Sequence, residues 1–331
     1  MEVLVTGGAG YIGSHAVRAL SLAGYSVVVL DNLSCGHSEA LAAVGNFKLY
    51  QIDLRDKQAV YAAFEPHRFC GVIHFAGAAL VSESVKNPEK YYDINVIGGL
   101  NLLSACKHFD VRHVVFSSTC ATYGEPKTVP ISEDHPQIPI NPYGRTKLAF
   151  EHILESYAQG YGLTYLALRY FNAAGADPSG DLGEDHAIET HLIPNVYYAV
   201  LGRLDHFTIF GADYPTPDGT CIRDYIHVAD LARAHVIGLE YLLRGGRSGC
   251  FNLGTGQGYS VREVIKACEV ACEKQVSVEV AARREGDAPA LVAQTDTARK
   301  ILGFQCQRSD IKTICEDAWR WHSRYPRGFQ S

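Results

Sequence analysis

The sequence predicts an α/β protein: a doubly wound parallel sheet with a smaller, discontinuous α/β unit beside it. Short apolar runs alternate with helical patterns through the first half of the chain, and this alternation is typical of βα units and parallel sheets. The runs are apolar almost throughout, as expected of strands that are buried on both faces. A glycine-rich turn joins the first run to the first helical pattern.

Six strands are predicted before residue 173, each as an apolar run of strand length. The runs are EVLVTG (2–7), YSVVVLD (25–31), NFKLYQID (46–53), CGVIHFAG (70–77), VRHVVFSS (111–118) and LTYLALRYFN (163–172). Helical patterns separate most of them, for example YIGSHAVRALSLAG (11–24), with Gly24 as its C-cap, and PEKYYDINVIGGLNLLSACKHF (88–109). VADLARAHVIGLEYLL (228–243) and GCFNLG (249–254) predict one more helix and one more strand of the same unit.

The composition changes after Asn172. Residues 172–191 and 211–225 are rich in Gly, Pro and Asp, and loops of this length in a compact protein are usually functional. We therefore expect two domains. The first takes residues 1–171 plus about 225–254, and the second takes about 172–224 and 255–331.

Charge and hydropathy exclude several classes of protein. A net charge of −6 and a pI near 6.2 argue against a nucleic-acid or polybasic membrane surface. No apolar run reaches the ~18 residues of a membrane span, and the chain opens on a strand without room for a signal peptide. The ten cysteines are scattered, and no His cluster joins Cys268 and Cys272 into a metal site. We expect buried thiols in a reducing compartment, the cytoplasm, and no metal.

The motif TGGAGYIGSH (6–15) runs from a strand through a glycine loop into a helix. Gly7, Gly10 and Gly13 fit the spacing Gly-x-x-Gly-x-x-Gly. In dinucleotide loops one glycine permits the tight turn, one lets the backbone approach the pyrophosphate, and one lets the helix pack on the strand. The helix N-terminus then faces the anion. The position at the first βα turn predicts a Rossmann-type dinucleotide domain.

Acidic residues end the second and third strands. Asp31 and Asn32 lie about 20 residues past the glycine loop, where a carboxylate accepts hydrogen bonds from adenosine ribose hydroxyls. A carboxylate there repels a 2′-phosphate, and no Arg directly follows, so NAD is expected rather than NADP. Asp53 and Leu54 end the third strand, where the adenine edge would lie. The alternative for Asp31 is a solvated acid in a turn.

Tyr143 and Lys147 stand four apart in NPYGRTKLAFEHIL (141–154), and Pro142 suits the first turn of a helix. On a helix, both side chains share one face. The spacing also arises by chance in a chain with 19 Tyr, so its surroundings must decide. A tyrosine base needs a pKa lowered from about 10 toward neutrality. Lys147 and an oxidised nicotinamide ring would supply the positive charge for this shift.

A hydroxyl cluster, Ser117, Ser118 and Thr119, ends the fifth strand at the edge where ligands bind in such sheets. Thr119 could bond a substrate hydroxyl and relay its proton. The alternative for all three hydroxyls is that they only form hydrogen bonds with the backbone of a turn or cap a helix.

Taken together, these motifs resemble the extended short-chain dehydrogenase/reductase family, and within it the UDP-hexose 4-epimerases. The resemblance covers nearly the whole chain. It rests on TGGAGYIGSH, HFAG, SSTCATYG, YGRTK, RYFNAAGA, DGTCIRDYIHV and RREGDAPALVA, in this order. It implies an NAD-dependent isomerase that interconverts UDP-glucose and UDP-galactose through a 4-keto intermediate, with tightly bound NAD and a homodimeric assembly. The helix at 88–109 is one candidate for the dimer contact.

The resemblance also implies roles for single residues. Tyr143 would be the catalytic base, Thr119 its partner, and Lys147 the ribose-binding residue that tunes the tyrosine. Further cofactor contacts would come from Tyr11, Ile12, Phe75, Ala76, Gly77, Asn95, Ser117 and Tyr170. Besides Thr119 and Tyr143, the substrate would be held by Asn172, His191, Leu192, Phe210, Arg223, Arg284, Asp287 and Leu291, largely from the second domain. Guanidinium groups suit a diphosphate, although each Arg could instead form a surface ion pair.

Three positions depart from the family pattern. Ala79 replaces a lysine near the cofactor phosphates, which would weaken NAD binding, and His191 replaces an Asn at the pyrophosphate. Leu291 takes the place of a bulky Tyr that gates the sugar C2 substituent, so we expect weaker activity on the UDP-N-acetylhexosamine pair as well. Leu291 could also be a core residue that never meets the sugar.

Two rival functions remain. A 4,6-dehydratase or sugar-acid decarboxylase on the same frame needs an extra acid after Thr119, where this chain has Cys120 and Ala121. A non-catalytic dinucleotide sensor would not need a Tyr/Lys pair with a hydroxyl partner.

Overall fold

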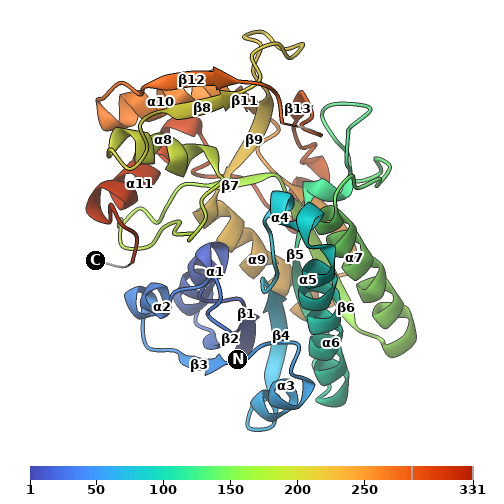
Figure 1. Cartoon of the computed structure of the whole chain (residues 1–331). Helices are drawn as coiled ribbons and strands as arrows, with labels where there is room; N and C mark the ends of the chain where they lie inside the picture. The colour runs from blue at the N-terminus through green and yellow to red at the C-terminus, as the bar shows by residue number, and fades with distance from the viewer. Residues whose placement is uncertain (285, 330–331) are drawn as a thin grey trace.

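The computed structural model describes residues 1–284 and 286–329, and it confirms the predicted doubly wound parallel sheet (Figure 1). Within this part of the chain, seven strands lie in the order β10-β6-β5-β4-β1-β2-β3, and each neighbouring pair is parallel. Their bounds are β1 Glu2–Thr6, β2 Ser26–Asp31, β3 Lys48–Gln51, β4 Phe69–His74, β5 His113–Thr119, β6 Thr164–Tyr170 and β10 Gly249–Leu253. Each coincides with one of the predicted apolar runs, although β4 begins one residue earlier, at Phe69, and β5 ends one residue later, at Thr119.

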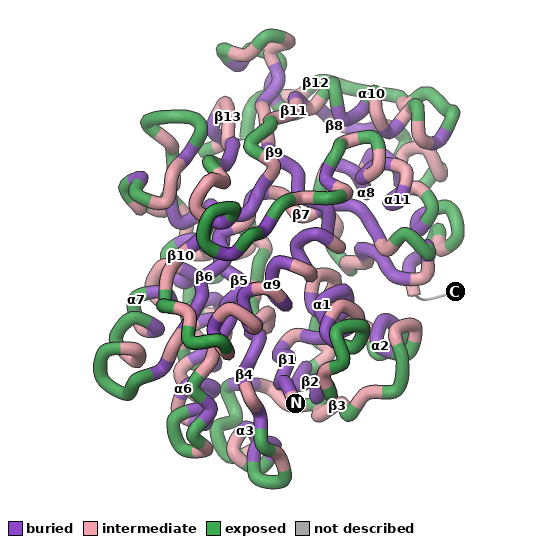
Figure 2. Tube along the Cα trace, turned by 180° about the vertical axis from the view of Figure 1, so that it is seen from behind, coloured by how far each residue is buried: buried purple, intermediate pink, exposed green. Residues whose placement is uncertain are grey.

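Helices cover both faces of this sheet. On one face α1 (Tyr11–Leu22) and α9 (Val228–Leu243) bury Val17, Leu20, Leu231 and Leu239 against strand residues such as Val5. On the other face, α3 (Lys57–Phe64), α6 (Gly99–His108) and α7 (Pro142–Tyr161) do the same with Phe64, Leu102 and Phe150. Figure 2 shows the central strands as buried and the exposed residues on outer helices and loops. Burial on both faces explains the near-continuous apolar runs.

The third strand departs from the expected burial. Lys48 and Gln51 of β3 are exposed, and Leu49 and Tyr50 are only partly buried. The cause is position: β3 is the last strand of the sheet order and pairs only with β2. An edge strand with charged and polar ends also discourages pairing with another chain.

Shorter helices complete the large unit. The predicted helix at 88–109 is one continuous helical stretch with a π-helical turn in its middle: α5 Pro88–Tyr92, the turn η1 Asp93–Gly98, and then α6. Such π turns often occur at functional sites, and this one carries Asn95. The remaining elements are α2 Ser38–Val44, α4 Val81–Lys86 and the 3₁₀ turn η2 Cys120–Thr122.

The chain leaves the large sheet at the carboxyl end of β6 and enters a smaller unit directly. Figure 1 shows its strands and helices gathered at one end of the large sheet. Its elements are β7 Asn172–Ala174, α8 Leu192–Val200, β8 Phe207–Phe210, β9 Ile222–His227, β11 Gly258–Ser260, α10 Val261–Cys272, β12 Val278–Ala281, β13 Ala290–Leu291, the π turn η3 Ala298–Leu302 and α11 Ile311–Arg324. In the described residues, β9 pairs with β7, β11 and β13, while β8 pairs with β12.

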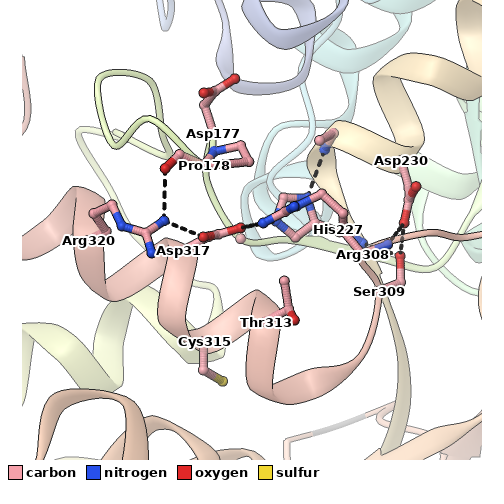
Figure 3. Close-up of polar contacts among 12 residues, drawn as sticks. Asp177, Pro178, His227, Asp230, Arg308, Ser309, Thr313, Cys315, Asp317 and Arg320 are labelled. Atoms are coloured by element: carbon pink, nitrogen blue, oxygen red, sulfur yellow. Dashed lines mark hydrogen bonds and ion pairs between the residues drawn. The ribbon is translucent and has the colours of Figure 1, made fainter.

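A buried polar network ties the C-terminal helix to the junction of β9 and α9 (Figure 3). His227 lies 3.2 Å from Asp317 of α11, and both side chains are almost fully buried. Arg308 and Arg320 also bind the Asp317 carboxylate, at 2.7 and 2.5 Å. Burial alone would raise the pKa of Asp317, but these three partners lower it to about 2. The carboxylate therefore stays charged and holds α11 in place through neutral pH.

The chain re-enters the large unit at Val228, the first residue of α9, and supplies β10 before returning to the smaller unit at β11. This path is compatible with the predicted division into two discontinuous domains, and that division stays a prediction. Within residues 1–284 and 286–329, no helix combines the length and the apolar character required to cross a membrane.

Candidate active site

The glycine loop lies between β1 and α1, and its three glycines have different surroundings. A Cβ at Gly7 would lie 2.5 Å from Ala76 N, and a Cβ at Gly13 would lie 2.0 Å from Gly7 O, so both positions exclude a side chain. A Cβ at Gly10 would meet only Gly7 O, at an ordinary 3.4 Å. The chain itself therefore does not require glycine at Gly10. Its bare backbone at the start of α1 fits the close approach of a pyrophosphate.

The expected adenosine contacts gather at the ends of β2 and β3. Asp31 is buried, and its two carboxylate oxygens accept the backbone N–H groups of Ala9 and Leu33 at 3.0 and 2.8 Å. The Asn32 amide donates to Asp53 at 2.9 Å, and Asp53 also binds Arg55. Burial raises the pKa of Asp31, while the two backbone donors oppose this rise. Leu54 is buried next to this group and packs in the core beneath α6.

The end of β4 lies beside the first two turns of α7. Phe75 N and Ala76 N both donate to Thr6 O, which ties this turn to the glycine loop. Asn95, from the π turn, accepts from Ala78 N at 2.8 Å and donates to Thr146 at 3.0 Å. A Cβ at Gly77 would come within 3.5 Å of Lys147 Nζ. The structure thus brings Gly77, Asn95 and Lys147 together.

Helix α7 presents Tyr143 and Lys147 to this group. Asn141 caps the helix by accepting Gly144 N at 2.8 Å, and Pro142 occupies its first turn as predicted. Lys147 Nζ lies 6.0 Å from the Tyr143 ring centre and donates to Ser117 O at 2.9 Å. The pair therefore lies on the helix face that points at the carboxyl end of β5, and Lys147 is 5% exposed.

The electrostatics of the pair differ from the expectation. Burial raises the pKa of Tyr143 above its usual value, Tyr170 adds to the rise, and a hydrogen bond with Thr119 opposes it. Burial lowers the pKa of Lys147 to about 8, which Glu151 partly offsets. In the chain by itself, desolvation of the phenol thus outweighs any help from Lys147. A fixed positive charge beside the ring is needed to bring the tyrosine into the range of a base.

Hydroxyl groups line the ends of β5 and β6. Ser117 Oγ and Tyr170 OH lie 2.5 Å apart, and Thr119 is paired in register with Tyr170. Thr119 Oγ1 also accepts Ala121 N at 3.1 Å, so it caps the following 3₁₀ turn while it lies beside Tyr143. Ser118 points elsewhere: it donates to Glu151 at 2.5 Å in the core. Its role is therefore structural support rather than contact with a ligand.

The smaller sheet places four of the expected substrate residues next to this edge. Asn172 opens β7 directly after β6, and its register partner on β9 is Tyr225. Arg223 of β9 binds the Asp287 carboxylate and is paired in register with Leu291 of β13. Leu291 is half-buried against a cluster that includes Cys120 and Phe171. The strand pairing thus carries Leu291 to the turn that follows Thr119.

The other expected substrate residues come from β8, from the start of α8 and from the segment before β13. The Arg284 guanidinium stacks 4.1 Å from the centre of the exposed Phe210 ring. Glu285 of the same motif lies outside the described residues. Leu192 starts α8 and packs against the core of the smaller unit. His191, the N-cap residue of α8, contacts Glu189 and Glu184 through Nδ1, so only Nε2 is left for a substrate.

The sequence analysis missed one buried group beneath the site. Arg169 binds Glu151 through two guanidinium nitrogens, Nε at 3.0 Å and Nη2 at 2.6 Å, and also donates to Tyr123 OH at 3.0 Å. Both charged side chains are at most 5% exposed. Glu151 also accepts a hydrogen bond from Ser118, and its charge partly offsets the lowering of the Lys147 pKa by burial. The available signal was the spacing of Tyr143, Lys147 and Glu151, which places all three on one helix face.

Known proteins resemble the chain over its whole length. It is 51% identical over 331 residues to the UDP-glucose 4-epimerase of Halalkalibacterium halodurans, covering 100% of this chain and 98% of that protein. The crystal structure of UDP-glucose 4-epimerase from Brucella ovis in complex with NAD matches with a TM-score of 0.93 and 51% identity, over 96% of this chain and 97% of that chain. The Bifidobacterium longum UDP-glucose 4-epimerase in complex with NAD+ and UDP matches with a TM-score of 0.94 and 40% identity, over 99% and 100%.

A family model described as the NAD dependent epimerase/dehydratase family matches residues 3–254. This match spans more than half of the chain, and it includes the glycine loop, the strand-end hydroxyls and the Tyr143/Lys147 helix face. The chain therefore belongs to the NAD dependent epimerase/dehydratase family.

Proposed function

We propose that the chain is an NAD-dependent isomerase that interconverts UDP-glucose and UDP-galactose by epimerisation at C4. One observation carries the proposal: Tyr143, Lys147 and Thr119 meet at the carboxyl edge of a sheet whose first turn is a glycine loop. The similarity to UDP-glucose 4-epimerases over the full chain supports the same activity. The Gly10 backbone and the Asp31 carboxylate suit NAD at that edge.

In this proposal the Tyr143 phenolate takes the proton of the sugar C4 hydroxyl, and Thr119 bonds that hydroxyl and helps to move the proton. NAD, when bound, supplies hydride uptake and return at C4. Lys147 holds ribose hydroxyls and, from about 6 Å, favours the phenolate form of Tyr143. The 4-keto hexose must rotate before it is reduced, so that its other face receives the hydride. The protein therefore has to keep the diphosphate bound while the hexose is free to rotate.

We propose that residues of the smaller unit bind the uridine diphosphate. Asn172, Arg223 and Asp287 lie beside the Tyr143 group, and guanidinium groups match phosphate geometry. Arg284 with Phe210, and His191 with Leu192, are assigned the outer part of the same substrate. We also propose weaker activity on the UDP-N-acetylhexosamine pair. Leu291 lies next to the Thr119 turn, and it is smaller than the Tyr that would exclude an N-acetyl group at the sugar C2 position.

A dehydratase or decarboxylase is disfavoured by the same geometry. The residue after Thr119 is Cys120, and burial raises the pKa of its thiol to about 12. Neither that thiol nor the methyl group of Ala121 can serve as an acid or base at neutral pH.

The deciding experiment is a coupled assay that supplies UDP-galactose and measures UDP-glucose. We expect conversion in both directions to one equilibrium ratio, with no net production of NADH. Formation of a 4-keto-6-deoxy sugar, or loss of carbon dioxide from a UDP-sugar acid, would assign the chain to another reaction of the family.

We further propose a cytoplasmic homodimer. All ten cysteines, each within the described residues, are free thiols, which suits a reducing compartment. The helix at 88–108 exposes 43% of Tyr92 and 47% of Ile97, which offers an apolar contact for a second copy. Sedimentation velocity of the purified protein measures this state.

A further inference from the structure

Two histidines and two glutamates converge in the loop between β7 and α8: Glu184, His186, Glu189 and His191. One ligand-type atom of each lies within 4.8 Å of all the others. His191 Nδ1 is 2.7 Å from Glu184 Oε1 and 2.9 Å from Glu189 Oε1. His186 Nδ1 is 3.4 Å from Glu184 Oε1 and 3.3 Å from Glu189 Oε2. We call these four residues the Glu/His cluster.

A second observation points to a ligand at this place. The Glu184 side chain is 4% exposed, and its Oε1 accepts no hydrogen bond from any residue that the structure describes, although His191 Nδ1 is close. Glu189 Oε1 is occupied by the backbone N–H groups of Thr190 and His191, both at 2.7 Å, which leaves Oε2 facing His186. The two histidines face this buried oxygen as counter-charges, and a metal ion held among the four side chains would satisfy it in their place.

We propose that the Glu/His cluster is a binding site for one divalent transition-metal ion, for which Zn²⁺ is the best fit. Imidazole nitrogen with carboxylate oxygen is a donor set that zinc accepts. Ligand atoms about 2.1 Å from a tetrahedral ion lie ~3.4 Å apart. The two His186 distances, 3.3 and 3.4 Å, match this spacing, and His191 Nδ1, 2.7 Å from Glu184 Oε1, needs to withdraw from that oxygen by less than one ångström.

Charge supports the same assignment. Burial alone would lower the pKa of His186, but Glu184 and Glu189 raise it to about 10, and they also raise the pKa of His191. Two carboxylates and two neutral imidazoles balance the charge of one divalent ion. Groups that face it from α1, α8 and α11 do not titrate near neutral pH: the pKa is raised for Tyr11 and Tyr198, and burial lowers that of His322 to about 4.

The position gives the ion a structural task. His186 packs against the Tyr11 ring of the glycine-loop helix, with ring centres 6.3 Å apart, and His191 is the N-cap residue of α8. Tyr11 OH in turn donates to Gly175 O at 2.6 Å. A bound ion would fix the segment 184–191 between the start of α1 and the start of α8. It would also commit His191 Nδ1 to the metal rather than to a substrate.

The test measures zinc binding to full-length, tag-free protein after treatment with a chelator. We expect one zinc per chain by elemental analysis after dialysis, and a thermal midpoint that rises with added zinc. Because an imidazole must be neutral to bind a metal, the association constant should increase as pH rises. Cobalt in place of zinc should give the visible bands of a four-coordinate site, without the sulfur charge-transfer band of a cysteine site.

Two variants test the ligands. His186→Gln should weaken zinc binding by at least ~10-fold, the smallest loss found when partners of metal ligands are removed. His206→Gln is the matched control, because His206 also lies beside one glutamate, Glu279, at 3.2 Å outside the cluster. No stoichiometric zinc in wild type, a sulfur band with cobalt, or equal binding by His186→Gln would overturn the proposal. If His186→Gln does not fold, the wild-type stoichiometry and pH slope decide.

Discussion

Tyr143 is the residue on which the proposed chemistry depends. Tyr143→Phe removes only the phenol oxygen from a side chain on the face of α7 that carries Lys147. We expect normal folding and retained NAD, with kcat reduced by at least ~10²-fold, the lower range for a general base. Tyr161→Phe, at the exposed end of the same helix, is the control and should keep its turnover. Near wild-type kcat in purified Tyr143→Phe would refute the assignment.

Lys147 should control the pH range of the reaction. The base acts when Tyr143 is deprotonated, so turnover should increase as pH rises through the pKa of Tyr143 in the NAD-bound protein. Burial raises that pKa, and positive charge lowers it. Lys147→Met removes one positive charge, so the rise in kcat should move to higher pH. The measurement is kcat against pH.

A second lysine provides the control for this profile. Lys107 Nζ lies 4.0 Å from the Tyr161 ring centre on the surface, so Lys107→Met removes a cation from a tyrosine outside the site. Its profile should match that of wild type. A profile that stays in place in Lys147→Met, or moves to lower pH, contradicts the tuning role.

Leu291 should set the size of the sugar pocket. It is half-buried beside Cys120 and Phe171, close to the Thr119 turn, and it is smaller than tyrosine. Apolar pockets reject a slightly larger group by only ~1–3 kcal/mol, so wild type should process the N-acetylhexosamine pair weakly. Leu291→Tyr should lower kcat/KM for that pair more than for UDP-glucose and UDP-galactose. The comparison is kcat/KM for both pairs, with Leu204→Tyr, on an exposed loop, as control.

Two results would count against this gate. One is the absence of N-acetyl activity in wild type, and the other is an unchanged ratio in Leu291→Tyr that still folds. Either result would make Leu291 a packing residue of the cluster around Tyr123 and Ile131.

At the scale of elements, a buried ion pair joins α7 to β6. Arg169 and Glu151 are at most 5% exposed, and two nitrogens of the planar guanidinium, Nε and Nη2, donate to the carboxylate. Removing one partner leaves the other charge buried, so Arg169→Met should lower the free energy of unfolding by about 3–5 kcal/mol. The exposed pair Arg244–Glu240 on α9 is the control, and Arg244→Met should cost only ~0.3–0.5 kcal/mol. Urea unfolding measures both values.

The double replacement sharpens this prediction. Arg169→Met combined with Glu151→Leu removes both charges, so it should destabilise less than the sum of the single changes. Additive losses would show that the two charges contribute independently, contrary to the paired geometry.

At the scale of the whole molecule, the reaction returns every hydride, so the cofactor can stay bound through turnover. Protein purified without added nucleotide should release NAD, not NADP, when it is denatured, because the Asp31 carboxylate repels a 2′-phosphate. Because Ala79 replaces a lysine near the cofactor phosphates, the amount of released NAD could fall below one per chain. Stoichiometric NADP, or turnover that needs a high concentration of added NAD, would contradict the interpretation of Asp31 or tight binding.

The glycine loop supplies a matched pair of variants for this measurement. Gly10→Ala should fold, because φ is −78° and its Cβ would meet only one atom, at 3.4 Å, yet it should lose nucleotide. Gly13→Ala should fail to fold properly, because its Cβ would lie 2.0 Å from Gly7 O. Full nucleotide content in Gly10→Ala would place the pyrophosphate elsewhere.

Patterns within short stretches of sequence were enough to predict the large sheet. Apolar runs located all seven of its strands, and Pro142 located the start of α7. The same kind of pattern placed Tyr143 and Lys147 on one helix face. A further local pattern, the spacing of Glu184, His186, Glu189 and His191 within eight residues, is also present in the sequence.

The sequence by itself determined the strands of the large sheet, the glycine loop and the catalytic candidates, because hydrophobic period and backbone sterics act between near neighbours. Only the tertiary structure decided that β3 is an edge strand, that Arg169 meets Glu151, and that Leu291 reaches the Thr119 turn. It also decided that burial raises the pKa of Tyr143 in the chain alone. Burial, ion pairing and pKa depend on residues that folding brings together from distant parts of the chain, and no local pattern contains them.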